Sequence, residues 1–120
     1  RSKRFESPMA FDVRLLRNAR RSLEDTFDFL HYDCNNRAYA VELYEAVIDS
    51  LKRLRVQRGF WIVDHDASEL VGETVYRVKI GKYKLLYRIK PEESKILVFA
   101  FVHEAQELGS GVLLSFRNKD

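Results

Sequence analysis

Two runs of alternating apolar and polar residues, separated by Gly81 and Lys82, limit what this chain can fold into. Residues 74–80 and 83–90 both alternate with the period of a β-strand, and the pair between them suits a turn. The pattern therefore predicts a β-hairpin. Because side chains alternate across a strand, the basic residues should share one face of this hairpin and most apolar residues the other. These basic residues are Arg77, Lys79, Lys82, Lys84, Arg88 and Lys90.

The segment before the hairpin predicts a short strand followed by a pair of helices. Residues 11–16 begin as an alternating run, and residues 19–32 place apolar side chains three and four positions apart, with Asn18 as a suitable N-cap. Residues 37–54 repeat the helical pattern after the turn-favouring residues 33–36, so the two helices should pack as an antiparallel hairpin. One face of the second helix carries Val41, Tyr44, Ile48 and Leu51.

The remaining segments complete an α+β fold. Residues 57–72 show no sustained period and predict a long connection with one short strand at 60–63, whereas residues 96–103 predict a central strand. In the C-terminal tail, 109–120, the apolar piece 112–116 suits an edge strand or a contact with another chain. We expect the N-terminal strand and the helical hairpin to pack on one face of a mainly antiparallel sheet, in two layers, and the other face to be polar.

Length and composition narrow the class of protein. With 120 residues, 46% of them hydrophobic and 32% charged, the chain suits one globular domain over residues 1–120, in which residues 1–8 read as a loose arm or vector-derived sequence. The longest apolar run, 96–102, is far shorter than the ~18 residues of a membrane helix, so we expect a cytoplasmic protein with no membrane partner. The single cysteine, Cys34, excludes an internal disulfide. Glycine-rich phosphate loops are absent from the sequence, so no cofactor is expected.

The basic hairpin face allows two interpretations. Neighbouring strands lie roughly 4.8 Å apart, so the six cations would form a concentrated positive surface that attracts phosphate groups or an acidic protein segment. Lysine and arginine on an exposed strand are also ordinary solubilising residues that discourage edge pairing.

Two histidines are the other candidates for chemistry. His103 closes the last strand and could exchange protons or bind a phosphate, although a lone histidine at a strand end is more often bonded to a neighbour. His65 lies between Asp64 and Asp66, but it lacks a second histidine or cysteine at ligand spacing, so we expect no metal site.

The hairpin and the last strand resemble the RelE/ParE superfamily of type II toxin–antitoxin toxins. The residues that carry the resemblance are Tyr76-Arg-Val-Lys-Ile-Gly-Lys-Tyr-Lys-Leu-Leu-Tyr-Arg-Ile89 and Ile96-Leu-Val-Phe-Ala-Phe-Val-His103, and the similarity extends over residues 11–107. It implies a helical hairpin on an antiparallel sheet and a toxin neutralised by a cognate antitoxin protein.

The resemblance implies one of two activities. RelE-like members cut messenger RNA on the ribosome; by position, the catalytic residues here would be Arg77, Lys79, Lys84 and His103, with Lys82, Arg88 and Lys90 binding RNA. ParE-like members instead bind DNA gyrase without nuclease chemistry, and a degenerate member would bind only its antitoxin. Glu104 and Glu107 stand where many nuclease members have arginines. The sequence favours the nuclease, because the four catalytic candidates would converge on one face.

Overall fold

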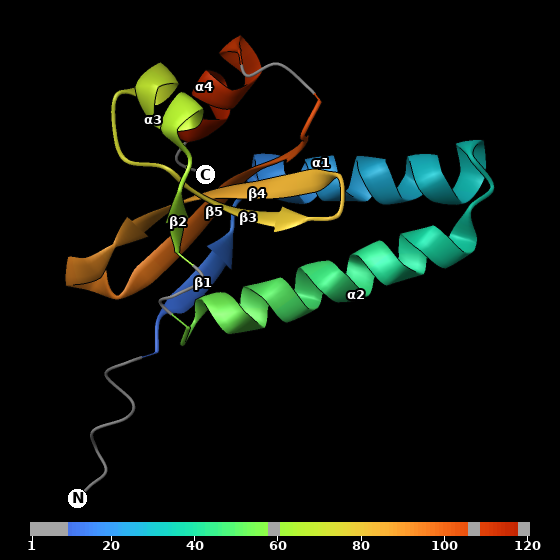
Figure 1. Ribbon diagram of the computed structural model, residues 1–120, viewed down its shortest axis with the longest axis horizontal. Coiled ribbons are helices and arrows are strands. Elements are labelled where there is room, and N and C mark those ends of the chain that lie inside the picture. The colour runs from blue at the N-terminus through green and yellow to red at the C-terminus, as the bar shows by residue number, and fades with distance from the viewer. Residues whose placement is uncertain (1–9, 58–60, 106–108, 118–120) are drawn as a thin grey trace, which may run out of the picture.

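A five-stranded mixed sheet organises the chain (Figure 1). The computed structural model describes residues 10–57, 61–105 and 109–117, so the expected arm at residues 1–8 lies outside the described residues. The strand order is β1-β5-β4-β3-β2; β1 pairs parallel to β5, and the other neighbours pair antiparallel. The strands are β1 (Asp12–Leu15), β2 (Ile62–Val63), β3 (Tyr76–Ile80), β4 (Tyr83–Lys90) and β5 (Lys95–His103).

The predicted helical hairpin covers one face of this sheet. It consists of α1 (Arg17–Asp28), a π-helical turn η2 (Phe29–Asp33) and α2 (Arg37–Leu54). The side chain of Asn36 caps α2 by accepting a hydrogen bond from the Tyr39 backbone N–H at 3.2 Å. The expected cap of the first helix is wrong, because α1 begins directly after β1 with Leu16 at the N-cap position, so Asn18 already lies in the first turn. The α+β class and the hairpin on the sheet are confirmed.

The core under α2 is filled by a different stripe from the one seen in the sequence. Val41 and Tyr44 are about half exposed, at 48% and 53%. Most of the buried residues of α2 lie one position before the residues of the predicted stripe. The helix is therefore rotated so that these residues pack in the same core as β3 and β4. They are Ala40, Leu43, Val47, Ser50 and Leu54.

The second face of the sheet is not the open surface that the sequence predicts. Two short helices, α3 (His65–Val71) and α4 (Ser110–Arg117), lie together on the side opposite α2 (Figure 1). They close a second apolar cluster over the sheet, to which α3 contributes Ala67 and α4 contributes Val112. The expected edge strand at 112–116 is therefore wrong, because this piece is helical. An apolar run as short as this one is compatible with a strand or with a helix.

A β-bulge interrupts the pairing of β4 with β5. Leu86 pairs with Ala100 and Tyr87 pairs with Val98, which leaves Phe99 as an extra residue on β5. The side-chain period of a strand is two, so one inserted residue moves every later side chain to the opposite face. The bulge therefore determines which face of the sheet each of the last side chains of β5 occupies.

In the described part of the chain, none of the helices has the length and apolar character needed to cross a membrane.

Candidate functional site

Three of the predicted catalytic residues meet in one cavity beside α3. Lys79 and Lys84 are direct cross-strand partners, and Arg77 shares their face. They line a cavity of about 580 Å³ together with acidic residues and one histidine. The remaining lining residues are Asp64, His65, Asp66, Glu104 and Ala105.

Lys84 forms an ion pair with Asp64 inside this cavity. Its Nζ lies 2.7 Å from Oδ2 of Asp64, and the two side chains are only 15% and 3% exposed. Asp64 also caps α3 by accepting a hydrogen bond from the Ala67 backbone N–H at 3.0 Å. Lys84 is thus held against a buried carboxylate and does not face solvent as a separate positive charge.

The pKa of Asp64 reports this environment. Burial by itself raises the pKa of the carboxyl group, but the hydrogen bonds from Lys84 and Ala67 and the charges of Lys84 and Arg77 outweigh it. The net result is a pKa below the ordinary value, so Asp64 is ionised at neutral pH.

Arg77 and Lys79 are also placed near oxygen acceptors. Arg77 donates a hydrogen bond to the Val63 carbonyl oxygen at 3.3 Å, which ties β3 to β2. Lys79 is 61% exposed and lies 4.0 Å from Glu104. The cavity therefore contains both cations and carboxylates. Its positive electrostatic potential is weaker than that of the uncompensated basic surface that the sequence predicts.

His103 lies on the opposite face of the sheet from these three residues. It pairs with Tyr83 across β4 and β5, whereas Lys84 pairs with Val102, so the two side chains point to opposite faces. The prediction that the four catalytic candidates converge on one face is wrong for His103. The physical reason is the bulge at Phe99, which reverses the alternation for the last four residues of β5.

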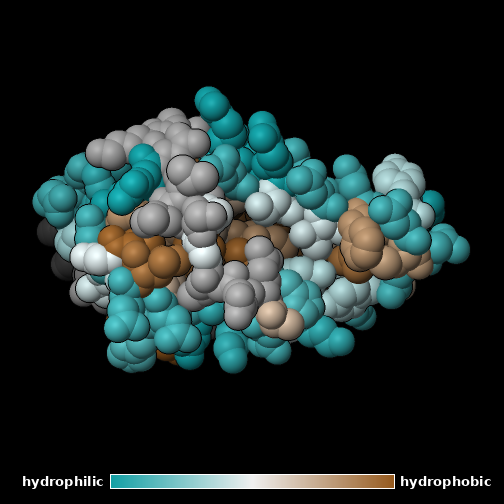
Figure 2. Space-filling view, turned by 90° about the horizontal axis from the view of Figure 1, so that it is seen from above, coloured by the Kyte–Doolittle hydropathy of each residue, from teal (hydrophilic) through white to brown (hydrophobic). Residues whose placement is uncertain are grey.

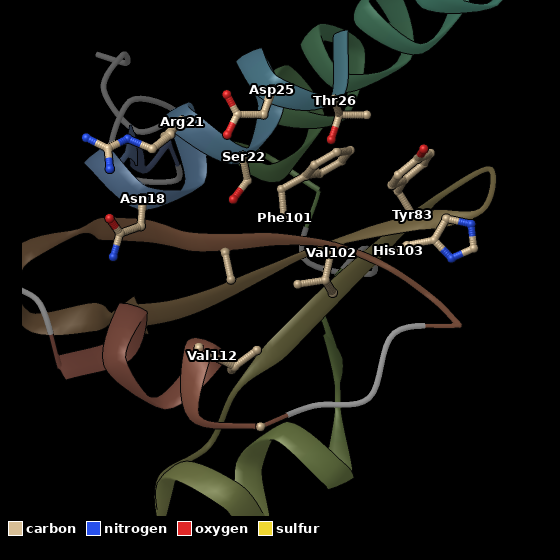
Figure 3. A pocket seen from close by; sticks show the side chains of 13 residues that line it. Asn18, Arg21, Ser22, Asp25, Thr26, Tyr83, Phe101, Val102, His103 and Val112 are labelled. Carbon is tan, nitrogen blue, oxygen red and sulfur yellow. The ribbon is translucent and has the colours of Figure 1, made fainter. Parts of the chain in front are cut away.

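The His103 ring belongs to a larger cavity between α1 and the end of β5. Figure 3 shows Tyr83 and His103 close together at one end of this cavity and Arg21 and Asn18 of α1 toward the other. The rings of Tyr83 and His103 meet edge to face with centroids 5.0 Å apart. Nδ1 of His103 accepts a hydrogen bond from the Ala105 backbone N–H at 3.0 Å, which fixes the ring at the strand end.

The three predicted RNA-binding residues do not form a common surface. Arg88 lies 3.3 Å from Glu73 and stacks over the Phe116 ring at 4.5 Å, so it holds α4 against the sheet. Lys90 lies 3.8 Å from Glu93 at the far end of β4, and Lys82 is exposed in the β3–β4 turn.

The residue that the sequence reading missed is Asp64. A signal was available, because an aspartate followed by a glycine eight positions later is the pattern of a short capped helix. Gly72 ends α3 with φ of +81°, a left-handed conformation that favours glycine.

The fold and the sequence together define the class of protein. The sequence model of the family described as "ParE toxin of type II toxin-antitoxin system, parDE" matches residues 13–108. The chain therefore belongs to the ParE toxin family, within the ParE/RelE superfamily of type II toxin–antitoxin toxins.

Two solved structures with related folds are similar to this chain. A chromosomal ParDE toxin–antitoxin structure from P. aeruginosa superposes with a TM-score of 0.59 at 15% identity, covering 80% of this chain and 97% of that chain. A RelBE2 toxin–antitoxin complex from Mycobacterium tuberculosis is 24% identical, with a TM-score of 0.45, covering 78% and 98%. No curated protein matches the chain. At 15% identity the ParDE structure supports the fold alone.

Proposed function

We propose that this protein stops bacterial growth by binding DNA gyrase, without cleaving messenger RNA. The observation that carries the proposal is the separation of His103 from Lys84 on opposite faces of the sheet. This reverses the preference drawn from the sequence, which depended on a single converging site.

Cleavage of RNA by its own 2′-hydroxyl needs a base, an acid and groups that stabilise the charge on the phosphate. The cavity beside α3 offers cations, but Lys84 is already paired with Asp64 and Lys79 lies near Glu104. A phosphate entering it would meet the carboxylates of Asp64, Asp66 and Glu104. His103 would have to act from the other side of the sheet. The arrangement favours a structural role for these residues over a nuclease role.

Membership of the ParE family supports the same choice, since ParE-like toxins act on gyrase by binding. We also propose a cognate antitoxin as the partner that neutralises the protein, supported by the family description and by the toxin–antitoxin neighbours. Action on gyrase would take place in the cytoplasm.

Inducible expression in bacteria tests the proposal. We expect growth arrest accompanied by a DNA damage response, while the ends of messenger RNAs remain unchanged. Growth arrest with new messenger cuts at in-frame codons and no DNA damage response would contradict it and restore the ribosome-dependent nuclease.

A further inference from the structure

The far end of the helical hairpin carries a pocket that the proposed function does not use. Both helices extend past the ends of the strands, so the turn between them overhangs the sheet (Figure 1). Figure 2 shows hydrophobic side chains among hydrophilic ones toward this end of the molecule. Among the residues there, Phe29 is 52% exposed and Tyr32 is 73% exposed.

Aromatic rings form much of the pocket wall. The pocket has a volume of about 310 Å³ and lies between α1, η2 and the first turns of α2. The rings of Phe27 and Tyr44 meet edge to face with centroids 5.5 Å apart, and those of His31 and Tyr32 lie 4.4 Å apart. Val41 completes the apolar wall.

The charged groups of this pocket are carboxylates. Asp28 and Glu45 line it, and within the described ranges neither is in an ion pair. Nδ1 of His31, which also lines the pocket, is buried with no hydrogen-bond partner among those residues. The chain as a whole has a net charge of +3, so the charge of this pocket is opposite in sign to the net charge of the protein.

We propose that this pocket binds an arginine side chain carried by an apolar segment of a protein partner. A guanidinium group stacks on aromatic rings and donates hydrogen bonds to carboxylates, which matches the rings and the two carboxylates of the pocket together. The exposed side chains of Phe29 and Val41 would contact apolar residues that flank the arginine.

The charge of the pocket excludes an acidic protein segment as its occupant. Such a segment would be repelled by Asp28 and Glu45. The pocket therefore provides a contact for a segment that is basic and apolar, and the inference does not depend on whether gyrase is the target.

A synthetic peptide tests the inference directly on the full chain. The probe is a capped helical peptide of roughly 12 residues, with a central arginine and leucines one turn away on either side. Binding is measured by the NMR signals of the His31 and Tyr44 side chains, which should shift as peptide is added until the change saturates. The double variant Asp28→Asn/Glu45→Gln should bind at least about tenfold more weakly, because hydrogen bonds to charged groups are among the strong ones.

Two controls make the test decisive. The variant Glu24→Gln/Glu42→Gln removes two exposed carboxylates of the same helices that do not line the pocket, and it should bind like the unchanged protein. A peptide with norleucine in place of arginine should bind at least about tenfold more weakly. Equal binding of the norleucine peptide, an equal loss in the control variant, or no binding of the arginine peptide would each overturn the inference. Circular dichroism verifies that each variant is folded.

Discussion

Nζ of Lys84 lies 2.7 Å from Oδ2 of Asp64, in an ion pair that joins strand β4 to the start of helix α3. Both side chains are largely removed from solvent, and Asp64 also caps the helix. A lysine that the sequence suggests as a phosphate ligand is thereby part of the structure that holds α3 on the sheet. The chemistry available on this face depends on that pair.

Removing Lys84 should destabilise the protein. In Lys84→Met the Asp64 carboxylate stays buried without its cation, and we expect a loss of about 3 kcal/mol in the free energy of unfolding. Urea denaturation measures it. The control is Lys82→Met, which changes an exposed lysine in the adjacent turn and should cost less than about 0.5 kcal/mol. Equal midpoints for the two variants would show that the pair contributes nothing.

Acid should remove the contribution of Asp64. Its folded-state pKa is lowered, so the stabilisation is present above the unfolded-state pKa of about 3.9 and is lost as pH falls through the folded-state value. The difference in stability between the unchanged protein and Asp64→Asn should therefore be constant near neutral pH and shrink below about pH 4. Urea denaturation from pH 7 to pH 3 measures it, and a difference that grew in acid would contradict the assigned sign.

Phe99, the extra residue of the bulge, should be a major source of stability. It is 1% exposed, and its ring meets that of Phe116 edge to face with centroids 5.3 Å apart. We expect Phe99→Ala to cost about 3–5 kcal/mol and to loosen α4 toward proteolysis. The matched control is Phe29→Ala, a half-exposed phenylalanine, for which the loss should stay below about 1 kcal/mol. Similar losses for both variants would refute the packing role of the bulge.

His103 should be dispensable for toxicity. In His103→Gln the new side chain still offers an acceptor to the Ala105 N–H, so stability should change by less than about 1 kcal/mol. Growth inhibition on induction should equal that of the unchanged protein, because the proposed inhibition of gyrase by binding requires no proton transfer from this residue. A folded His103→Gln protein that fails to stop growth would make His103 part of the activity.

The parts of the fold that the sequence predicts are those set by local periodicity. The β3–β4 hairpin follows from alternation over residues 74–90, and the helical hairpin follows from apolar spacing of three and four. The face that α1 buries follows from its apolar spacing, whereas the face that α2 buries is harder to predict, because the stripe with Val41 and Tyr44 contains only apolar and aromatic residues while the buried stripe includes Ser50.

The site could not be predicted in the same way because it depends on contacts distant in the sequence. Phe99 and Ala100 are both apolar and both buried, so the sequence gives no sign of which one is the inserted residue. The position of the bulge determines on which face of the sheet His103 lies, so that face could not be predicted either. The neutralisation of Lys84 depends on α3. Asp64 and Gly72 mark the ends of this helix of seven residues, but the sequence does not show that it packs beside β4.

The most direct test of the account is a supercoiling assay with purified gyrase and purified toxin. We predict that the unchanged protein inhibits supercoiling in proportion to its concentration, that His103→Gln inhibits equally, and that messenger RNA on translating ribosomes stays intact with either protein. Uninhibited gyrase together with ribosome-dependent cleavage that is lost in His103→Gln would contradict the account.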